Sequence, residues 1–380
     1  MHEIVVLGAG YAGMAAAASL VARTTGRDVH ITIVNASERF TERLRLHQAA
    51  SGQELPDLRI PDHLPQAEFV QGWVTNVDVD KQTVRLDDER NIAYDTLVYA
   101  LGGVADTSGV PGVDHHAYTL DSAHSAELLA RRLSTLDNGI VAVCGSGLTG
   151  IEAAAEIAER HPHLEVLLLG RSAPGKDLGP KAKAYLDKTL DRLGVQVRGR
   201  VEITKVLPGA VNLAGGDTVA ADVVLWTSGV RVPVLARGLD VDGHGRIVTD
   251  DALRSVSHPN VYAVGDAAAI RQKYGVMHGT CQGGMPTGVH AALSIMRELD
   301  GKAPRRFRFG YFHLPLSLGR HDGVIQFTKP DGTPRRFALT GRRAVWYKET
   351  VSSAPWPTYR RMLTSPRSTA LWTHGGRYTR

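Results

Sequence analysis

The hydrophobic positions of this chain fall into short runs, and one arrangement of runs occurs twice. The segments 4–17 and 141–154 each begin with an apolar run, continue through a GxGxxG turn and end in a stretch rich in alanine. That order predicts a buried strand, a tight turn and a helix. A second apolar run follows each segment, at 29–34 and at 166–169. The pattern therefore predicts two strand–helix–strand units of the kind that builds a parallel sheet.

The rest of the chain shows shorter apolar runs. Strands are expected at 69–74, 83–86, 96–102, 221–229 and 261–264, and a helix at 180–193. The run that ends at Gly229 repeats the run that ends at Gly102. From about residue 305 the runs become aromatic, and antiparallel strands are expected at 307–311, 324–327 and 337–339. These strands indicate a separate small domain at the C-terminal end.

Composition restricts the class of protein. The 380 residues are 43% hydrophobic and 22% charged, as in ordinary globular proteins, and the length exceeds what one hydrophobic core serves. The net charge of +5 is too small to argue for a nucleic-acid partner. The alternating arginines and phenylalanines at 306–309 fit a strand with one wet face better than a nucleic-acid surface. Forty glycines exceed average usage and favour close approach of the backbone to a ligand.

Cysteine and histidine usage argues against thiol and metal chemistry. Cys144 and Cys281 stand far apart, no CxxC occurs, and the sixteen histidines show no metal-ligand spacing. No secretion signal opens the chain and no apolar run is long enough to span a bilayer, so we expect a reduced, cytoplasmic protein without a metal. Aromatic and basic residues at 346–372 would suit the inner face of a membrane. Pro355 and Pro357 interrupt a long amphipathic helix there, so peripheral membrane contact is not favoured.

The two GxGxxG turns carry the first indication of chemistry. In such a turn the first glycine permits a tight bend, the second lets backbone amides reach a pyrophosphate, and the third lets helix and strand pack closely. The helix that follows presents unpaired N–H groups to phosphates. Two packing turns without a ligand are the alternative, but the strand–turn–helix context favours a dinucleotide at both. The expected contact residues are Gly8, Gly10, Ala12 and Gly13 in the first copy, and Gly145, Gly147, Leu148 and Thr149 in the second.

Three motifs in this order resemble the flavoproteins with two dinucleotide-binding domains, a group that includes the pyridine nucleotide–disulfide oxidoreductases. They are the turn at 8–13, a second turn extended to GxGxxGxE at Glu152, and the run 261–266 that ends in Gly265 and Asp266. The resemblance covers about residues 1–300. It implies FAD at the first turn, NADPH or NADH at the second, and a hydrogen bond between Asp266 and the ribitol chain of FAD. An aspartate that caps a following helix is the other interpretation of Asp266.

The resemblance also implies an α/β fold with two Rossmann-like dinucleotide-binding domains, of which the FAD domain is discontinuous, and a small α+β C-terminal domain. The expected limits are 1–113 and 247–308 for the FAD domain, 114–246 for the NAD(P)H domain and 309–380 for the C-terminal domain. Disulfide reductases of the group need a redox-active cysteine pair beside the flavin, which this chain lacks. Electrons are therefore expected to leave the flavin directly for a small-molecule acceptor.

Two further stretches, 39–48 and 281–288, resemble the type II NADH:quinone oxidoreductases and the apoptosis-inducing-factor-like oxidoreductases. In the quinone reductases the second stretch begins with Ala-Gln, faces the flavin and carries another glutamine four residues later. Gln282 matches the first glutamine, whereas Pro286 takes the place of the second. The resemblance makes Gln282 a candidate catalytic residue. A glycine-rich helix start packed under the flavin is the other interpretation of this stretch.

The resemblance assigns further residues to the two cofactors. Arg43 or Arg45 would contact FAD, unless both are loop arginines in solvent. Glu152 would face the nicotinamide as a second candidate catalytic residue, unless it lies on a helix surface. The remaining expected cofactor contacts are Asn35, Val74, Ala100, Gly102, Gly229, Gly265, Asp266 and Gln282.

The end of the second strand in the second unit favours NADPH over NADH. NAD-selective units carry an acidic residue there, which accepts hydrogen bonds from the ribose. This chain has Gly170, Arg171 and Ser172 instead, and Arg171 can form paired hydrogen bonds to a 2′-phosphate. The enzymes that it resembles mostly use NADH, so both nucleotides stay open. In the first unit Asn35 replaces the acid, and its amide oxygen can still accept from the FAD ribose.

The sequence thus predicts an FAD-dependent NAD(P)H oxidoreductase in which hydride passes from nicotinamide to flavin while the protein orients the two rings. Three roles are consistent with it. The first is a respiratory-type quinone reductase at the membrane face. The second is a soluble enzyme that acts on a quinone-like or other aromatic metabolite. The third is a slow redox sensor that binds FAD and nucleotide and signals through a partner.

Overall fold

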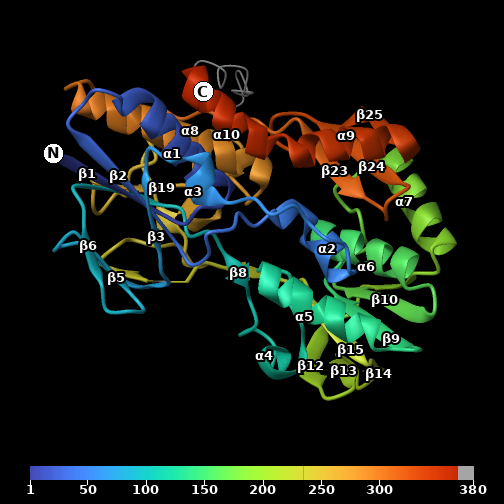
Figure 1. The fold of residues 1–380 in the computed structure, drawn as a ribbon. Helices are drawn as coiled ribbons and strands as arrows, with labels where there is room; N and C mark the ends of the chain where they lie inside the picture. The colour runs from blue at the N-terminus through green and yellow to red at the C-terminus, as the bar shows by residue number, and fades with distance from the viewer. Residues whose placement is uncertain (234, 367–380) are drawn as a thin grey trace.

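The computed structural model describes residues 1–233 and 235–366. Two parallel sheets with helices around them and a small antiparallel sheet near the C-terminus make up the molecule (Figure 1). The α/β class predicted from the two glycine turns is therefore confirmed. The chain passes from the first parallel sheet to the second and back through β8 (Val104–Ala105) and β16 (Val230–Arg231), which pair antiparallel.

The first part is built on a five-stranded parallel sheet in the order β19-β7-β1-β2-β3. Its strands and main helices are β1 (His2–Leu7), α1 (Tyr11–Thr24), β2 (Val29–Asn35), β3 (Glu68–Gln71), β7 (Thr96–Tyr99), β19 (Val261–Ala263) and α8 (Cys281–Leu299). The edge strand β19 is reached only after the chain has returned from the second part, so two separate stretches of chain build this sheet.

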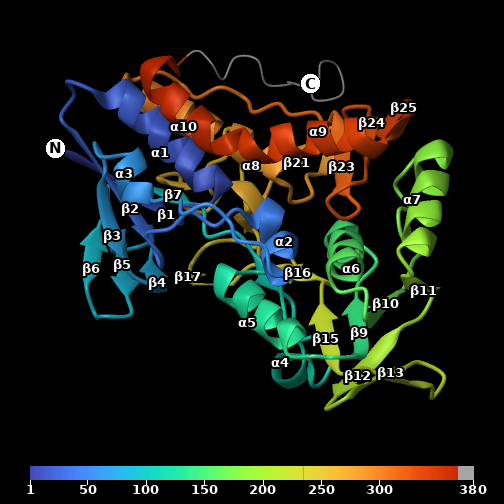
Figure 2. The ribbon, with the colours of Figure 1, turned by 45° about the vertical axis from the view of Figure 1, so that its right-hand side comes forward.

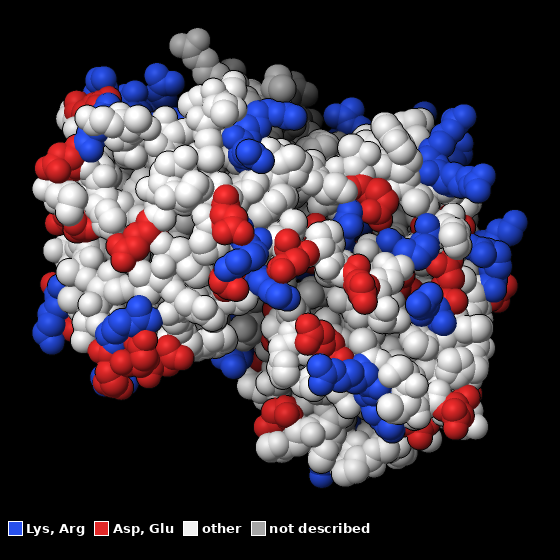
Figure 3. Space-filling view, in the orientation of Figure 1, with Lys and Arg blue, Asp and Glu red and all other residues white. Residues whose placement is uncertain are grey.

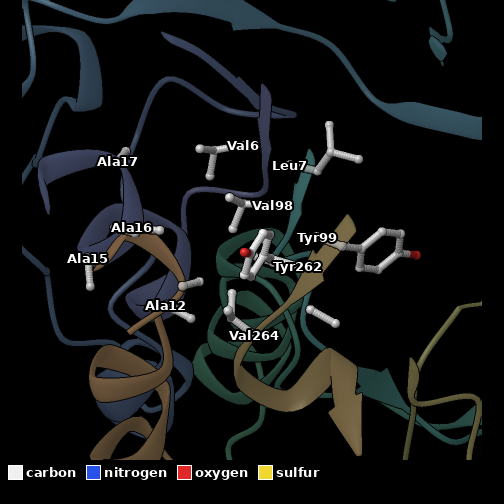
Figure 4. Packing of buried hydrophobic residues seen from close by; sticks show 14 of the residues in the cluster. Val6, Leu7, Ala12, Ala15, Ala16, Ala17, Val98, Tyr99, Tyr262 and Val264 are labelled. Atoms are coloured by element: carbon white, nitrogen blue, oxygen red, sulfur yellow. The ribbon is translucent and has the colours of Figure 1, made fainter. Parts of the chain in front are cut away.

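Small side chains bring α1 and α8 close to each other. Figure 4 shows Val6 and Val98 of the sheet pointing toward the alanines of α1. The backbones of the two helices almost touch, because a Cβ atom at Gly288 would lie 2.1 Å from the carbonyl oxygen of Ala12. Since interiors are close-packed, a larger residue at Gly288 would push α8 away from the start of α1 and from the glycine turn before it.

The expected single strand at 69–74 is wrong, because the chain changes sheets at Gly72. The Gly72 amide donates to the carbonyl oxygen of Asn35, which ends the parallel pairing. A Cβ atom at Gly72 would lie 2.8 Å from Leu86 Cδ1, so glycine lets the chain turn closely against the next hairpin without displacing that side chain. The mixed sheet that follows has the order β17-β4-β5-β6, in which only β17 and β4 pair in parallel. Its strands are β4 (Val74–Asp78), β5 (Thr83–Leu86), β6 (Asn91–Ala93) and β17 (Ala236–Arg237).

Short elements complete the first part and place its loops. They are η1 (Arg43–Arg45), α2 (Leu46–Ala50), α3 (Ile60–His63), β18 (Ile247–Val248), η2 (Gly265–Ala267), β20 (Ala268–Ala269), β21 (Arg271–Gln272) and β22 (Gly275–Val276).

The second part repeats the architecture of the first on a smaller scale. Its parallel sheet has the order β11-β10-β9-β15, and a three-stranded antiparallel sheet, β12-β13-β14, lies beside it. The elements are α4 (Val113–His116), α5 (Ala123–Ser134), β9 (Gly139–Cys144), α6 (Leu148–Arg160), β10 (Leu164–Gly170), α7 (Pro180–Arg192), β11 (Gln196–Gly199), β12 (Ile203–Leu207), β13 (Ala210–Leu213), β14 (Thr218–Ala220) and β15 (Val223–Trp226). The domain limits expected from the sequence stay a proposal.

The C-terminal part consists of a three-stranded antiparallel sheet and two helices. They are β23 (His313–Ser317), β24 (Gly323–Thr328), β25 (Pro334–Thr340), α9 (Gly341–Ser353) and α10 (Pro355–Thr364). The strands expected at 324–327 and 337–339 are confirmed, but the one at 307–311 is wrong. Its backbone amides donate to Asp251, to the side chain of Gln272 and to Pro330, so no neighbouring strand pairs with it.

Helices α9 and α10 lie end to end across one side of the molecule in both ribbon views (Figures 1 and 2). The prolines 355 and 357 fall in the first turn of α10, where a missing N–H costs little, so they divide two helices rather than abolish helix. Tyr359 is fully buried and donates from Oη to the carbonyl oxygen of Tyr11. The C-terminal helices thus bind the start of α1 at one end and the second part at the other. On the face in Figure 3, basic and acidic side chains are interspersed.

Candidate active site

The first glycine turn has the geometry that close approach of a phosphate requires. Gly8 has φ +89°, and a Cβ atom there would lie 2.6 Å from the carbonyl oxygen of Ala100. A Cβ atom at Gly13 would lie 1.8 Å from the carbonyl oxygen of Gly8, so helix and turn are in contact. A Cβ atom at Gly10 would meet no protein atom within 4 Å. The turn is therefore closed on its inner side and open at Gly10, at the N-terminus of α1.

The second turn repeats this geometry. Gly145 has φ +140°, and a Cβ atom at Gly150 would lie 1.8 Å from the carbonyl oxygen of Gly145. A Cβ atom at Gly147 would meet no protein atom within 4 Å. A cleft of about 760 Å³ lies beside this turn. Its lining includes Gly145, Gly147, Leu148, Arg171, Ser172, Lys176 and Gly229. Five of the predicted nucleotide contacts are thereby brought together in one cleft.

Arg171 stands at the carboxyl end of β10 and is exposed. Ser146 in the glycine turn donates from Oγ to the carbonyl oxygen of Ser172 at 2.7 Å, which ties this end of β10 to the turn. Within the part of the chain that the structure describes, the Arg171 guanidinium has no carboxylate partner. It is therefore available to an anionic group of a nucleotide in the cleft.

Asn35 and Asp266 fit the first dinucleotide by their hydrogen-bonding state. Asn35 accepts the Ala9 amide at 2.9 Å and donates to the carbonyl oxygen of Ser37, so it holds the first turn in place. Asp266 lies in η2, and no side-chain hydrogen bond to it occurs among the described residues. Burial raises the pKa of its carboxyl, and Arg43 opposes that rise. The strand β20 follows η2, so Asp266 does not cap a helix and its carboxylate is left for the hydroxyls of a ligand.

The two arginines of η1 serve different partners. Arg43 donates from Nη1 to the carbonyl oxygen of Gly103 at 2.8 Å and lines the central cavity described below. Arg45 forms an ion pair with Glu349 at 2.9 Å and donates to Ser353 Oγ, both on α9. Arg43 is therefore the arginine that faces the ligand space, whereas Arg45 anchors the C-terminal helix.

A central cavity of about 1040 Å³ lies where the three parts of the chain meet. Its lining includes Arg43 and Gln282 from the first part, Thr149 and Glu152 from the second, and Lys348 from α9. Leu148, Lys176, Asp177 and Leu314 line both this cavity and the nucleotide cleft. The two spaces therefore adjoin each other, and a dinucleotide bound at Gly147 could extend one end toward the central cavity.

Glu152 is buried at the junction of three elements rather than exposed on a helix surface. It accepts hydrogen bonds from the amide and the hydroxyl of Ser317 and an ion pair from Lys348 at 2.8 Å. Burial by itself raises the pKa of the Glu152 carboxyl, but Lys348, together with the Ser317 amide, outweighs it, and the pKa lies below its usual value. Glu152 is therefore ionised, and burial lowers the pKa of neighbouring His47 to about 4, which keeps that ring neutral.

Gln282 lies in the first turn of α8, and its side-chain amide forms hydrogen bonds with the C-terminal part. Its Nε2 donates to the carbonyl oxygen of His313 at 3.0 Å, and its Oε1 accepts the Phe312 amide at 3.0 Å. Gln282 also lines the central cavity. It therefore fixes the position of the segment 312–313 in the cavity wall.

The other predicted contact residues surround the two turns. Gly102, Gly229 and Gly265 have positive φ angles, which glycine adopts most easily. Ala12 and Ala100 pack against the first turn, Val74 is buried at the start of β4, and Leu148 and Thr149 open α6 beside the cavity. Sequence reasoning missed His47, His313, Ser317, Tyr347 and Lys348. His47 lies within the stretch 39–48 noted above. No motif marks the other four, which the C-terminal part brings to the cavity or to the residues of its wall only in the folded chain.

Cys144 is poorly suited to thiol chemistry. Cys144 is a free, fully buried cysteine in β9, and burial raises the pKa of its thiol to about 12. No described helix combines the length and the apolar character that a membrane span requires.

Two glycine turns that are each free of protein atoms at the middle glycine, with a cleft beside the second turn and a large cavity adjoining that cleft, are the arrangement of a two-site dinucleotide oxidoreductase. The family model described as pyridine nucleotide-disulphide oxidoreductase matches residues 2–293. The chain belongs to this family, and it is an NAD(P)H-dependent flavoprotein oxidoreductase with FAD as its cofactor.

Three comparisons with individual proteins agree with this assignment. An NADH dehydrogenase-like protein of Mycobacterium tuberculosis is 30% identical over 384 residues, which cover 93% of this chain and 94% of that protein. A type II NADH:quinone oxidoreductase of Staphylococcus aureus is 27% identical over 391 residues, which cover 92% of this chain and 94% of that protein. The structure of the sulfide:quinone oxidoreductase of Aquifex aeolicus shares the fold, with a TM-score of 0.81, 18% identity and coverage of 98% of this chain and 95% of that one.

Proposed function

We propose that this enzyme passes electrons from NADPH, and less efficiently from NADH, to a quinone-like acceptor in the central cavity. The observation that carries the proposal is the position of that cavity, which adjoins the nucleotide cleft and has Gln282 in its wall. Apolar side chains suited to a flat ring line it, among them Leu44, Leu46, Met285, Pro286 and Leu314. The printed name of the relative from S. aureus, an NADH:quinone oxidoreductase, supports the same acceptor class.

The chain's own residues bind and orient the reactants. When bound, FAD supplies the hydride and electron chemistry that no amino-acid side chain offers. The ionised Glu152 stands beside Thr149 where the cleft opens into the cavity, and its carboxylate can accept from the amide of a nicotinamide. Lys348 and Ser317 hold that carboxylate still, so its orientation costs nothing when the nucleotide enters. Arg43 and Asp266 are the groups that would hold FAD.

Anaerobic mixing with nucleotide tests the proposed function. The yellow protein should bleach within the time needed to mix it with NADPH, and it should recover its colour when a naphthoquinone is added. Recovery with other aromatic metabolites but with no quinone would favour the soluble metabolic enzyme. A flavin that is not bleached by either nucleotide would favour the redox sensor. Sedimentation with vesicles then decides whether the enzyme works at a membrane.

Gln282→Ala is expected to slow acceptor reduction by about tenfold while flavin reduction by NADPH changes little, because the wall segment 312–313 loses both anchors. Rapid-mixing kinetics of the two half-reactions measures this. Gln272→Ala is the matched control. The Gln272 side-chain amide also forms two hydrogen bonds with backbone groups, at Phe307 and Phe309, but Gln272 does not line the cavity. Equal slowing of both half-reactions in Gln282→Ala would remove Gln282 from the acceptor side.

Arg171→Ala is expected to raise the NADPH concentration at half-saturation by roughly 10- to 100-fold and to leave NADH almost unchanged, because paired hydrogen bonds to a 2′-phosphate are lost. Titration of the flavin reduction rate with each nucleotide measures the effect. Arg198→Ala is the control, since Arg198 is exposed on the neighbouring strand β11 and does not line the cleft. Wild-type preference for NADH, or an unchanged NADPH response in Arg171→Ala, would contradict the preference for NADPH.

A further inference from the structure

A histidine–tyrosine pair lies at the wall of the central cavity, where His313 lines the cavity and Tyr347 contacts His313 from behind. His313 opens β23, is buried, and lines the central cavity. Its Nδ1 lies 2.8 Å from the Oη atom of Tyr347 on α9, with the two rings nearly perpendicular at 78°. Tyr347 is only half-buried. The pair therefore leads from the cavity lining at His313 to the partly exposed Tyr347 on α9.

The position of His313 is fixed from several sides. Gln282 binds its carbonyl oxygen, strand pairing with Phe327 holds its backbone, and the Phe312 ring lies against its imidazole with centroids 4.0 Å apart. Tyr347 is held in turn by the Phe327 ring, 5.8 Å from its own. A ring held in this way keeps its orientation toward the cavity without an ordering cost during reaction.

The hydrogen-bonding pattern leaves one ring nitrogen of His313 for a ligand. Among the described residues, Nδ1 has Tyr347 as its partner and Nε2 has no protein partner. The 2.8 Å contact fits donation from Oη to Nδ1, which puts the ring proton on Nε2, and the proposal below requires this tautomer. Burial, followed by the nearby Lys348, lowers the pKa of His313 to about 4, so the ring is neutral near pH 7.

We propose that Tyr347 and His313 form a proton relay that delivers one proton from solvent to the oxygen of the reduced acceptor. This inference rests on the proposed reduction of a quinone-like molecule in the central cavity. A quinone that becomes a quinol takes up two electrons and two protons. NADPH provides the two electrons and one proton as hydride, and the second proton must come from the protein or from water.

The relay balances without a charged intermediate at His313. An O–H bond forms on the acceptor as the Nε2–H bond of His313 breaks, and the Tyr347 proton moves to Nδ1 at the same time. Water then returns a proton to the Tyr347 oxygen. After the product has left, water moves the ring proton from Nδ1 back to Nε2, which restores the starting tautomer for the next turnover. Because burial raises the pKa of the Tyr347 phenol above its usual value near 10, it yields a proton only to a strong base such as an acceptor oxyanion. The Tyr347–His313 pair therefore gives up its proton only after the acceptor has received the electrons. His313 is the catalytic residue of the pair, and Tyr347 is a positioning residue that acts through it.

Acceptors that differ in their need for protons test the relay. His313→Gln keeps a polar side chain but cannot pass a proton, and Tyr347→Phe keeps the ring that packs on Phe327. We expect His313→Gln to reduce a 1,4-naphthoquinone about 100-fold more slowly, and Tyr347→Phe about tenfold more slowly, in line with the usual worth of general acid catalysis. Ferricyanide, which takes an electron and no proton, should be reduced at the wild-type rate by both variants. The naphthoquinone rate of the wild type should fall in deuterium oxide, and that of His313→Gln should fall less.

A phenol of the same type elsewhere in the C-terminal interface provides the control. Tyr185→Phe removes a hydrogen bond to Asp322 at 2.8 Å, outside the cavity lining, and should leave both acceptors unaffected. Nuclear magnetic resonance of ¹⁵N-labelled histidine measures which ring nitrogen of His313 carries the proton, without turnover. The variant His313→Gln assigns the signal. The His313 signal should show a protonated Nε2 between about pH 6 and 8 and should change in Tyr347→Phe.

The outcomes separate this inference from the proposed function. A wild-type enzyme that bleaches with NADPH but reduces no quinone overturns the proposed acceptor and the relay together. Normal naphthoquinone reduction by His313→Gln, or equal losses with naphthoquinone and ferricyanide, overturns the relay alone. A protonated Nδ1 in the wild-type spectrum also overturns it.

Discussion

Gly10→Val is expected to purify as a folded but colourless protein, with at most about a tenth of the wild-type flavin, because the valine side chain occupies the path by which backbone amides reach a pyrophosphate. The new Cβ meets no protein atom within 4 Å, and Gly10 has φ −75°, which any residue adopts. The substitution therefore does not strain the chain itself. Its effect should appear in the flavin absorbance per protein and in a lower melting temperature, since a bound ligand stabilises the fold.

Two other glycines serve as references for this result. Gly13→Val should fail to fold, because its Cβ would lie 1.8 Å from the carbonyl oxygen of Gly8. Gly243→Val should remain yellow, because Gly243 also has free space around its Cβ position but lies far along the chain from either turn. Circular dichroism separates the unfolded variant from the colourless one. Full flavin in Gly10→Val would show that FAD does not approach the first turn.

The glycine turns were predictable from sequence because their geometry is local. A tight bend, a free approach and a close packing contact each require glycine at a set spacing, and the structure reproduces all three in both turns. The same holds for the strands on either side, because continuous apolar runs next to such turns fit only a parallel sheet with both faces covered. The sequence therefore predicts the fold class and the two dinucleotide turns without any long-range information.

The wall of the central cavity could not be predicted in this way. Glu152 was expected beside the nicotinamide, but the residues near it in the sequence do not indicate that Lys348 and Ser317 hold its carboxylate. These contacts form only when the C-terminal part docks on α6. The two arginines of η1 show the same limit. Arg43 and Arg45 are two residues apart, and the docking of α9 alone decides that Arg45 binds Glu349 while Arg43 faces the ligand space.

The two wrong strands show where period-two patterns mislead. At 69–74 the pattern continues while the chain moves to another sheet, because Gly72 packs against Leu86. At 307–311 the alternation of Phe307, Phe309 and Tyr311 reflects burial of their rings, but the amides bond to separate loops. Alternating burial requires only an extended chain with one covered face, whereas a strand also requires a neighbour with free backbone groups.

Gly147→Val is expected to give the complementary result to Gly10→Val: a yellow protein that NADPH no longer bleaches. The Cβ position at Gly147 is as free of protein atoms as that at Gly10, and its φ of −74° suits any residue. Only the nucleotide in the second cleft should meet the valine. Loss of the amide contacts to a pyrophosphate should raise the NADPH concentration at half-saturation by about 100-fold or more, which corresponds to about 3 kcal/mol.

The pair of variants assigns the two turns independently of the acceptor. Flavin content reports on the first turn and the rate of anaerobic bleaching reports on the second. A chemical reductant such as dithionite should still bleach Gly147→Val, because that reaction needs the flavin but not the nucleotide cleft. If Gly147→Val instead loses its flavin and keeps its affinity for NADPH, the two turns have exchanged roles. In that case the acceptor would enter beside Arg171 rather than beside His313.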